Sequence, residues 1–230
     1  MKLLAFETAT EACSVALYLD GEVRERFEIA PRRHAELSLP WADALLAEAG
    51  LARSQLDAIA VGRGPGAFTG VRLAIALAQG IALALDRPVV PVSTLRALAA
   101  QASGERILAA IDARMGEIYA ATFRREGEEL LATSDETVIA PGLYELSGQG
   151  NDWLGVGTGF AAESGTLQSH LGARFTRIDA TALPRASDVA KLAVQACARG
   201  EAIAAELVEP AYLRNNVALT LKEQKALRGR

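Results

Sequence analysis

The sequence of 230 residues contains 24 Lys and Arg against 28 Asp and Glu, a formal net charge of −4, and 50% of its residues are hydrophobic. This composition excludes wholesale disorder and provides apolar material for one large core or two small domains. The acidic balance argues against a self-sufficient nucleic-acid-binding protein, because phosphate neutralisation needs clustered Lys and Arg. Two cysteines and two histidines are too few for a disulfide framework or a His-rich metal centre, so we expect no metal site.

The chain opens with three predicted antiparallel strands. Residues 3–7 and 13–19 are short apolar runs, and residues 22–29 alternate loosely between polar and apolar side chains. Asp20-Gly21 is a strong hairpin signal, because glycine tolerates the positive φ of a type I′ turn. A helix is predicted over 36–49, where apolar residues recur at helical spacing, with Pro40 in its first turn.

Two buried strands then alternate with two helices. The strands cover residues 56–61 and 89–92, and the helices cover 71–85 and the segment ending at Gln101, with Ser93 or Thr94 as its cap. The 71–85 stretch is shorter than the roughly 20 residues that span a bilayer, so we expect a helix buried in protein. Glu7 interrupts the apolar N-terminal run, which predicts no signal peptide and a cytoplasmic location.

The second half repeats the opening pattern and then becomes rich in loops. Its predicted elements are strands over 106–112 and 117–123, a helix over 186–199, a strand over 207–213 and a basic tail from 214 that contains Lys222, Lys225, Arg228 and Arg230. We therefore predict a βββαβαβα domain over 1–103 and a smaller α+β domain over 104–230. Each half begins with a strand–turn–strand unit whose first strand carries an acid, Glu7 or Asp112, which indicates a duplicated architecture.

The segment 61–72, Val-Gly-Arg-Gly-Pro-Gly-Ala-Phe-Thr-Gly-Val-Arg, places four glycines between a strand and a helix. Such a loop can hold a phosphate close to free backbone N–H groups at a helix start. It can equally be a tight connection in which glycine permits close packing. The spacing matches neither a P-loop nor a Rossmann fingerprint, and the residues alone leave both interpretations open.

Four segments resemble the TsaB (YeaZ) family. They are Phe6–Leu17, Gly64–Arg72, Ile111–Tyr119 and Pro210–Arg214, of which Gly64–Arg72 is the most specific. The resemblance implies an α/β fold of the actin, Hsp70 and sugar-kinase class (ribonuclease H-like), with two related domains, the second reduced. It further implies a role in making threonylcarbamoyladenosine, the modified adenosine beside the anticodon of tRNAs that read codons beginning with A.

Members of this family resemble the catalytic subunit TsaD but do not perform the chemistry. The resemblance implies a scaffold that pairs with TsaD and helps to recruit the ATPase TsaE, with tRNA held by the complex rather than by this chain. The alternative is an independent ATP-binding kinase or ATPase of the same fold class. Neither histidine, His34 or His170, has a second histidine at metal-binding spacing, which agrees with a non-catalytic subunit.

A nucleotide loop of this fold class would involve the glycines and the acid at the end of the first strand. The candidate residues are Glu7, Thr8, Gly62, Gly64, Gly66 and Gly70. Family members usually carry Asp where this chain has Glu7, and the extra methylene displaces a carboxylate whose metal-water geometry tolerates little movement. We therefore expect no required cofactor and no functional ATP site. Asp112 can be a counterpart acid or can accept N–H bonds at its own turn.

The resemblance implies that the 36–49 and 71–85 helices pair with the equivalent helices of a partner. The candidate interface residues are Leu37, Trp41, Leu45, Val71, Ala74, Ile75 and Ala78. Small residues at i, i+4 allow close helix approach, and Trp41 is the expected anchor because tryptophan is enriched among interface hot spots. The same surface can form a homodimer when the partner is absent. The competing interpretation is that both helices are buried within the monomer.

Overall fold

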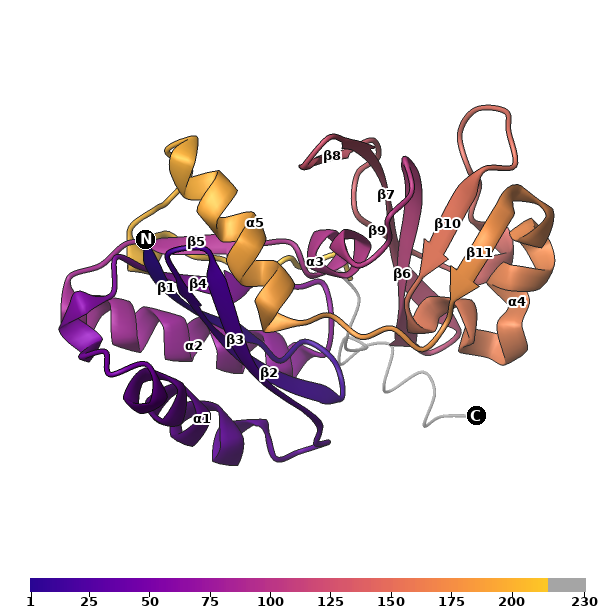
Figure 1. The fold of residues 1–230 in the computed structure, drawn as a ribbon. Helices are drawn as coiled ribbons and strands as arrows, with labels where there is room; N and C mark the ends of the chain where they lie inside the picture. The colour runs from indigo at the N-terminus through magenta and orange to yellow at the C-terminus, as the bar shows by residue number, and fades with distance from the viewer. Residues whose placement is uncertain (215–230) are drawn as a thin grey trace, which may run out of the picture.

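The computed structural model describes residues 1–214, and its first half forms one layered unit (Figure 1). Its strands are β1 (Lys2–Glu7), β2 (Ala12–Leu19), β3 (Glu22–Ile29), β4 (Ala58–Gly62) and β5 (Val89–Val92). Its helices are α1 (His34–Glu48), α2 (Phe68–Leu85) and α3 (Thr94–Ala100). The predicted hairpin is confirmed, since Asp20 and Gly21 both have positive φ. Ser93 caps α3, because its hydroxyl accepts a hydrogen bond from the Arg96 backbone N–H at 3.0 Å.

The second half contains a second sheet and more regular structure than its loop-rich sequence predicts. Its strands are β6 (Arg106–Arg114), β7 (Glu117–Glu126), β8 (Glu129–Ala132), β9 (Thr137–Ile139), β10 (Trp153–Val156) and β11 (Phe175–Asp179), and its helices are α4 (Ala162–Leu171) and α5 (Ala186–Ala198). Short 3-10 turns lie at Arg53–Gln55, Pro141–Leu143, Thr158–Phe160, Gly172–Arg174 and Ala205–Leu207.

The two sheets share one strand order. The first runs β3-β2-β1-β4-β5 and the second β8-β7-β6-β10-β11, with β9 paired to β7 outside this path. In each sheet the opening strand pairs antiparallel with the next strand of the chain and parallel with a later one. This correspondence is what duplication of one architecture produces. The α1 position has no helical counterpart between β8 and β10, where the described chain forms β9 and a 3-10 turn.

One helix from each half of the chain packs against the sheet formed by the other half. Leu95 and Leu98 of α3 pack against Ile107 and Ala109 of the second sheet, although α3 follows β5. In return α5, near the end of the described chain, covers the face of the first sheet opposite α1 and α2 (Figure 1). A single division near residue 104 does not describe this arrangement, because residues 186–198 complete the core of the first sheet.

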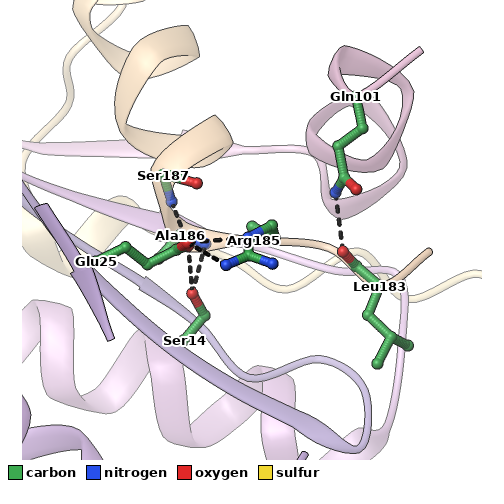
Figure 2. A network of polar contacts seen from close by, with 7 residues as sticks. All are labelled: Ser14, Glu25, Gln101, Leu183, Arg185, Ala186 and Ser187. Atoms are coloured by element: carbon green, nitrogen blue, oxygen red, sulfur yellow. Dashed lines mark hydrogen bonds and ion pairs between the residues drawn. The ribbon is translucent and has the colours of Figure 1, made fainter. Parts of the chain in front are cut away.

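Glu25 of β3 holds the start of α5 on the first sheet (Figure 2). Its carboxylate accepts hydrogen bonds from Arg185 Nε at 2.9 Å and Nη2 at 2.6 Å, from the Ser187 backbone N–H at 3.0 Å, and from the Ser14 hydroxyl at 2.8 Å. Ser14 Oγ in turn accepts the Ala186 N–H at 2.9 Å. This network satisfies N–H groups that a helix start leaves without intrahelical partners, and it does so from a strand distant in sequence.

Two local expectations differ from the structure. Helix α1 begins at His34, so Pro40 lies in its second turn and not its first; Pro40 is exposed there, where a break in the hydrogen-bond ladder faces water. The expected strand over 207–213 is absent from the described residues. That segment instead crosses to the glycine loop, where Ala211 N–H donates to Arg63 O at 2.8 Å. The basic residues from 222 onward lie outside the described residues.

Helix α2 is long and apolar enough to cross a membrane by length and composition alone, with a mean hydropathy of 1.7. It covers the first sheet instead: Val71, Ala74, Ile75 and Ala78 lie in the core with residues of β1 and β4. Its other side carries the exposed residues Ala76, Gly80, Leu83 and Ala84. Part of its apolar surface therefore remains uncovered.

Candidate functional site

The glycine loop packs against the β1–β2 turn. A Cβ at Gly62 would lie 1.9 Å from Glu7 Oε2, and one at Gly70 would lie 2.0 Å from Thr8 O. A Cβ at Gly66 would lie 2.4 Å from Ala9 O. Gly66 and Gly70 thus permit two segments of backbone to approach each other closely, and Gly62 leaves room for the Glu7 carboxylate. Of the two interpretations left open by the residues, the structure favours the tight connection at these three positions.

Glu7 points into the protein and not into a cleft. Its side chain is buried, with 1% of the residue exposed, and lies under Gly62. Oε1 accepts the Ala9 backbone N–H at 2.7 Å, and Oε2 accepts the Thr94 hydroxyl at 2.9 Å. Burial raises the pKa of the Glu7 carboxyl from 4.5 to about 7, although the hydrogen bonds from Ala9 and Thr94 lower it.

These contacts test whether Glu7 fits the metal-water role that the fold class implies. Such a role requires an ionised carboxylate open to a hydrated cation. Glu7 is closed to solvent, its oxygens already accept hydrogen bonds within the protein, and its pKa is near neutrality. The residue does not fit that role. Over residues 1–214, no group of three or more His, Cys, Asp or Glu side chains is placed to hold a metal ion.

A cleft of about 290 Å³ lies between the β1–β2 turn and the β6–β7 turn, beside but not including Glu7. Asp112, which lines it, is engaged locally: Oδ1 accepts the Arg114 N–H at 2.7 Å, and Oδ2 pairs with Arg114 Nη1 at 2.7 Å. The turn-stabilising interpretation of Asp112 is the one that the structure shows. His34 also lines the cleft, with Nε2 2.9 Å from Thr10 O.

The expected partner residues are mostly internal. Five of the seven are buried in the hydrophobic core between the first sheet and helices α1 and α2, namely Leu45, Val71, Ala74, Ile75 and Ala78. Leu37 and Trp41 are half-buried, and Trp41 packs against the same core. These five residues therefore offer no exposed contact to a partner, because Leu45 of α1 and the other four on α2 are covered within the chain itself.

A different stripe of the same helices is exposed. Ala76, Gly80 and Leu83 follow one another at i, i+4 and i+7 along the side of α2 away from the sheet, and Leu83 is 64% exposed. Leu39 of α1 is 45% exposed and lines a groove of about 340 Å³ that also includes Gly80 and Ala84. We call Leu39, Ala76, Gly80, Leu83 and Ala84 the α1/α2 outer face.

The sequence of α2 shows two stripes of small residues, and it does not indicate which of them faces outward. Ala74/Ala78 and Ala76/Gly80 are both pairs of small residues at i, i+4. Which pair faces outward depends on where the sheet lies, and that is set by contacts distant in sequence.

The protein has two sheets with the same strand order, an acid at the end of β1 and a glycine loop before α2. These features define a protein of the actin, Hsp70 and sugar-kinase fold class. The sequence profile described as "TsaD: tRNA N6-adenosine threonylcarbamoyltransferase" matches residues 27–222. The tRNA threonylcarbamoyladenosine biosynthesis protein TsaB of Escherichia coli is 43% identical over 95% of this chain and 96% of its own length. TsaB of Haemophilus influenzae is 42% identical, over 94% and 95%. YeaZ from Pseudomonas aeruginosa has a solved structure with a TM-score of 0.84 and 44% identity, covering 92% of this chain and 99% of that one. The chain belongs to the TsaB (YeaZ) family.

Proposed function

We propose that this chain is a non-catalytic subunit in tRNA threonylcarbamoyladenosine biosynthesis, and that it pairs with a TsaD homologue through the α1/α2 outer face. Its relatives from Escherichia coli and Haemophilus influenzae are named for this pathway. The observation that carries the proposal is the uncovered apolar surface of α2: a helix that only covers a sheet needs one apolar face, whereas this one is apolar on its outer side too.

The interior placement of Glu7 supports a non-catalytic role. The acid that would orient a hydrated cation is buried and hydrogen-bonded to its neighbours. We infer that the chain requires no ATP of its own, that it acts in the cytoplasm, and that it helps a TsaE homologue to join the pair. tRNA is contacted through the assembled complex, in keeping with the net charge of −4. Alone, the chain can form a homodimer through the same face.

The small residues of the outer face explain how a partner helix could fit. Ala76 and Gly80 leave the backbone of α2 accessible, and a Cβ at Gly80 would meet nothing within 4 Å. Leu39 and Leu83 flank them as exposed apolar side chains. Burying such side chains contributes roughly 1.5–3 kcal/mol each, so a few of them suffice to anchor a helix pair.

Size-exclusion chromatography of the chain mixed with the TsaD homologue tests this pairing. We expect co-elution of the wild-type chain and loss of co-elution with Leu83→Glu or Leu39→Glu, because each places a charge in an apolar contact. Leu143→Glu is the matched control, since Leu143 is 70% exposed but belongs to the second half of the chain. Co-elution that survives both outer-face variants would reject the interface. Trp41→Glu is a poorer test, because Trp41 packs against the monomer core.

A further inference from the structure

Three segments that are far apart in the sequence meet at one pocket of about 240 Å³. They are the start of α2, the β6–β7 turn and residues 210–214. These are also three of the four segments that carry the family resemblance. The packing of the glycine loop accounts for Gly62, Gly66 and Gly70, but it does not account for the side chains that this loop and the other two segments present here.

Large apolar side chains are exposed around this pocket. Phe68 is 61%, Met115 81% and Tyr212 56% exposed, and each comes from a different one of the three segments. Scattered exposed apolar residues need no explanation, whereas a contiguous group with polar residues at its rim marks an interaction site. We call Phe68, Arg72, Met115 and Tyr212 the aromatic patch.

Arg72 contacts both rings of the patch, and within residues 1–214 it forms no ion pair with an acid. Its guanidinium carbon is 3.2 Å from the centroid of the Phe68 ring and 5.0 Å from that of Tyr212, and Nη2 donates to the Tyr212 hydroxyl. Nη1 is buried and has no hydrogen-bond partner among the described residues. A buried donor without an acceptor destabilises the folded protein, and an acceptor that reached it would remove that cost.

The neighbouring arginines are already neutralised. Arg114 pairs with Asp112, and Arg214 pairs with Glu117. Among the residues that the structure describes, the pocket therefore offers one arginine without an acidic partner, held between two rings and beside apolar surface. A nucleic acid or a nucleoside triphosphate carries several negative charges, and its binding needs several unpaired Lys or Arg side chains. A single carboxylate attached to an apolar segment matches both the charge and the lining.

We propose that the aromatic patch docks a protein segment that presents a carboxylate side chain next to an apolar one. The carboxylate accepts hydrogen bonds from Arg72, and the apolar side chain packs against Phe68, Met115 and Tyr212. This surface is distinct from the α1/α2 outer face, so the inference goes beyond the proposed pairing with TsaD.

Methyl NMR offers a direct test, because the chain contains only two methionines. Met115 reports on the patch, and Met1, which packs against the α5 side of the first sheet, is an internal control. The probes are the N-acetyl dipeptide amides Glu-Leu, Gln-Leu and Lys-Leu, each titrated into the full chain labelled with ¹³C-methyl methionine. We expect Glu-Leu to shift the Met115 signal saturably at roughly millimolar concentration, with Gln-Leu about tenfold weaker and Met1 unmoved.

Variants assign the response to Arg72. Arg72→Gln should reduce the affinity for Glu-Leu to that for Gln-Leu, and Arg72→Lys should restore it only in part, because lysine lacks the planar fork that stacks between rings. Arg124→Gln, an exposed arginine of β7 paired with Glu126, is the control that should change nothing. An unmoved Met1 signal shows that each variant is folded.

Equal responses to all three dipeptides, or no response to any of them, would overturn the proposal. So would a stronger response to ATP than to Glu-Leu. Glu223 is the one acid in the sequence after residue 213, and a Met115 signal that is shifted in Glu223→Gln without any probe would also overturn the proposal. The last would assign the patch to the chain's own C-terminal segment. Because none of these measurements uses TsaD, failure here leaves the co-elution result, and with it the proposed function, unaffected.

Discussion

Replacing Glu7 by Gln should make the protein more stable at pH 8 and leave it little changed at pH 5. The carboxyl is fully buried, and burial raises its pKa from 4.5 to about 7. A tenfold change in a proton-binding constant corresponds to about 1.4 kcal/mol, so ionisation of Glu7 costs the folded protein roughly 3 kcal/mol relative to the unfolded chain.

The sign follows from proton uptake. Below pH 4.5 the carboxyl is protonated in both states, and the raised pKa costs nothing. As pH rises towards 7, the unfolded chain loses the proton while the folded protein keeps it, so the free energy of unfolding falls. Above pH 7 the carboxyl is ionised in both states, and the full cost remains. Glutamine cannot ionise and should escape this loss.

Urea denaturation at pH 5, 6, 7 and 8 measures the difference between the wild type and Glu7→Gln. Asp188, whose pKa burial raises to about 6, is present in both proteins and drops out of that difference. Glu128→Gln, at an exposed position, controls for the substitution itself. A difference between wild type and Glu7→Gln that is the same at pH 5 and pH 8 would refute the buried, near-neutral carboxyl and reopen the metal-water role.

Two further pairs of variants test the packing. Gly62→Ala, whose Cβ would lie 1.9 Å from Glu7 Oε2, should lower the free energy of unfolding by about 2–4 kcal/mol, whereas Gly80→Ala, with open space around its Cβ, should raise it by roughly 0.5–1 kcal/mol. Urea denaturation ranks them, and the reverse order would contradict the packing interpretation of the glycine loop. Glu25→Ala should lower the free energy of unfolding by about 2 kcal/mol and speed hydrogen exchange at the start of α5, whereas Glu22→Ala on the same strand should do neither. Unchanged exchange in Glu25→Ala would show that the Glu25 hydrogen bonds are not needed to hold the start of α5.

The candidate site could be predicted only in part. Its glycines and its strand-end acid are apparent from spacing, and so is the small-residue character of α2. The direction of the Glu7 side chain is not, because it depends on Thr94, which lies 87 residues further along the chain. The convergence of Phe68, Met115 and Tyr212 also needs the fold, since their segments share no local contact in the sequence.

Elements whose cause is local can be predicted from neighbouring residues alone. The Asp20-Gly21 hairpin, the Ser93 cap and the apolar runs of β1, β2, β4 and β5 follow from backbone preference and periodicity within a few residues.

Which surfaces face outward depends on contacts between elements that are distant in the sequence. Helix α5 returns to the first sheet, α3 covers the second, and the sheet buries Ala74 and Ala78 while leaving Ala76 and Gly80 exposed. The physical reason is that burial is a property of pairs of surfaces. A helix sequence shows which of its stripes are apolar, but the partner that each stripe meets is chosen by contacts between residues far apart in the chain.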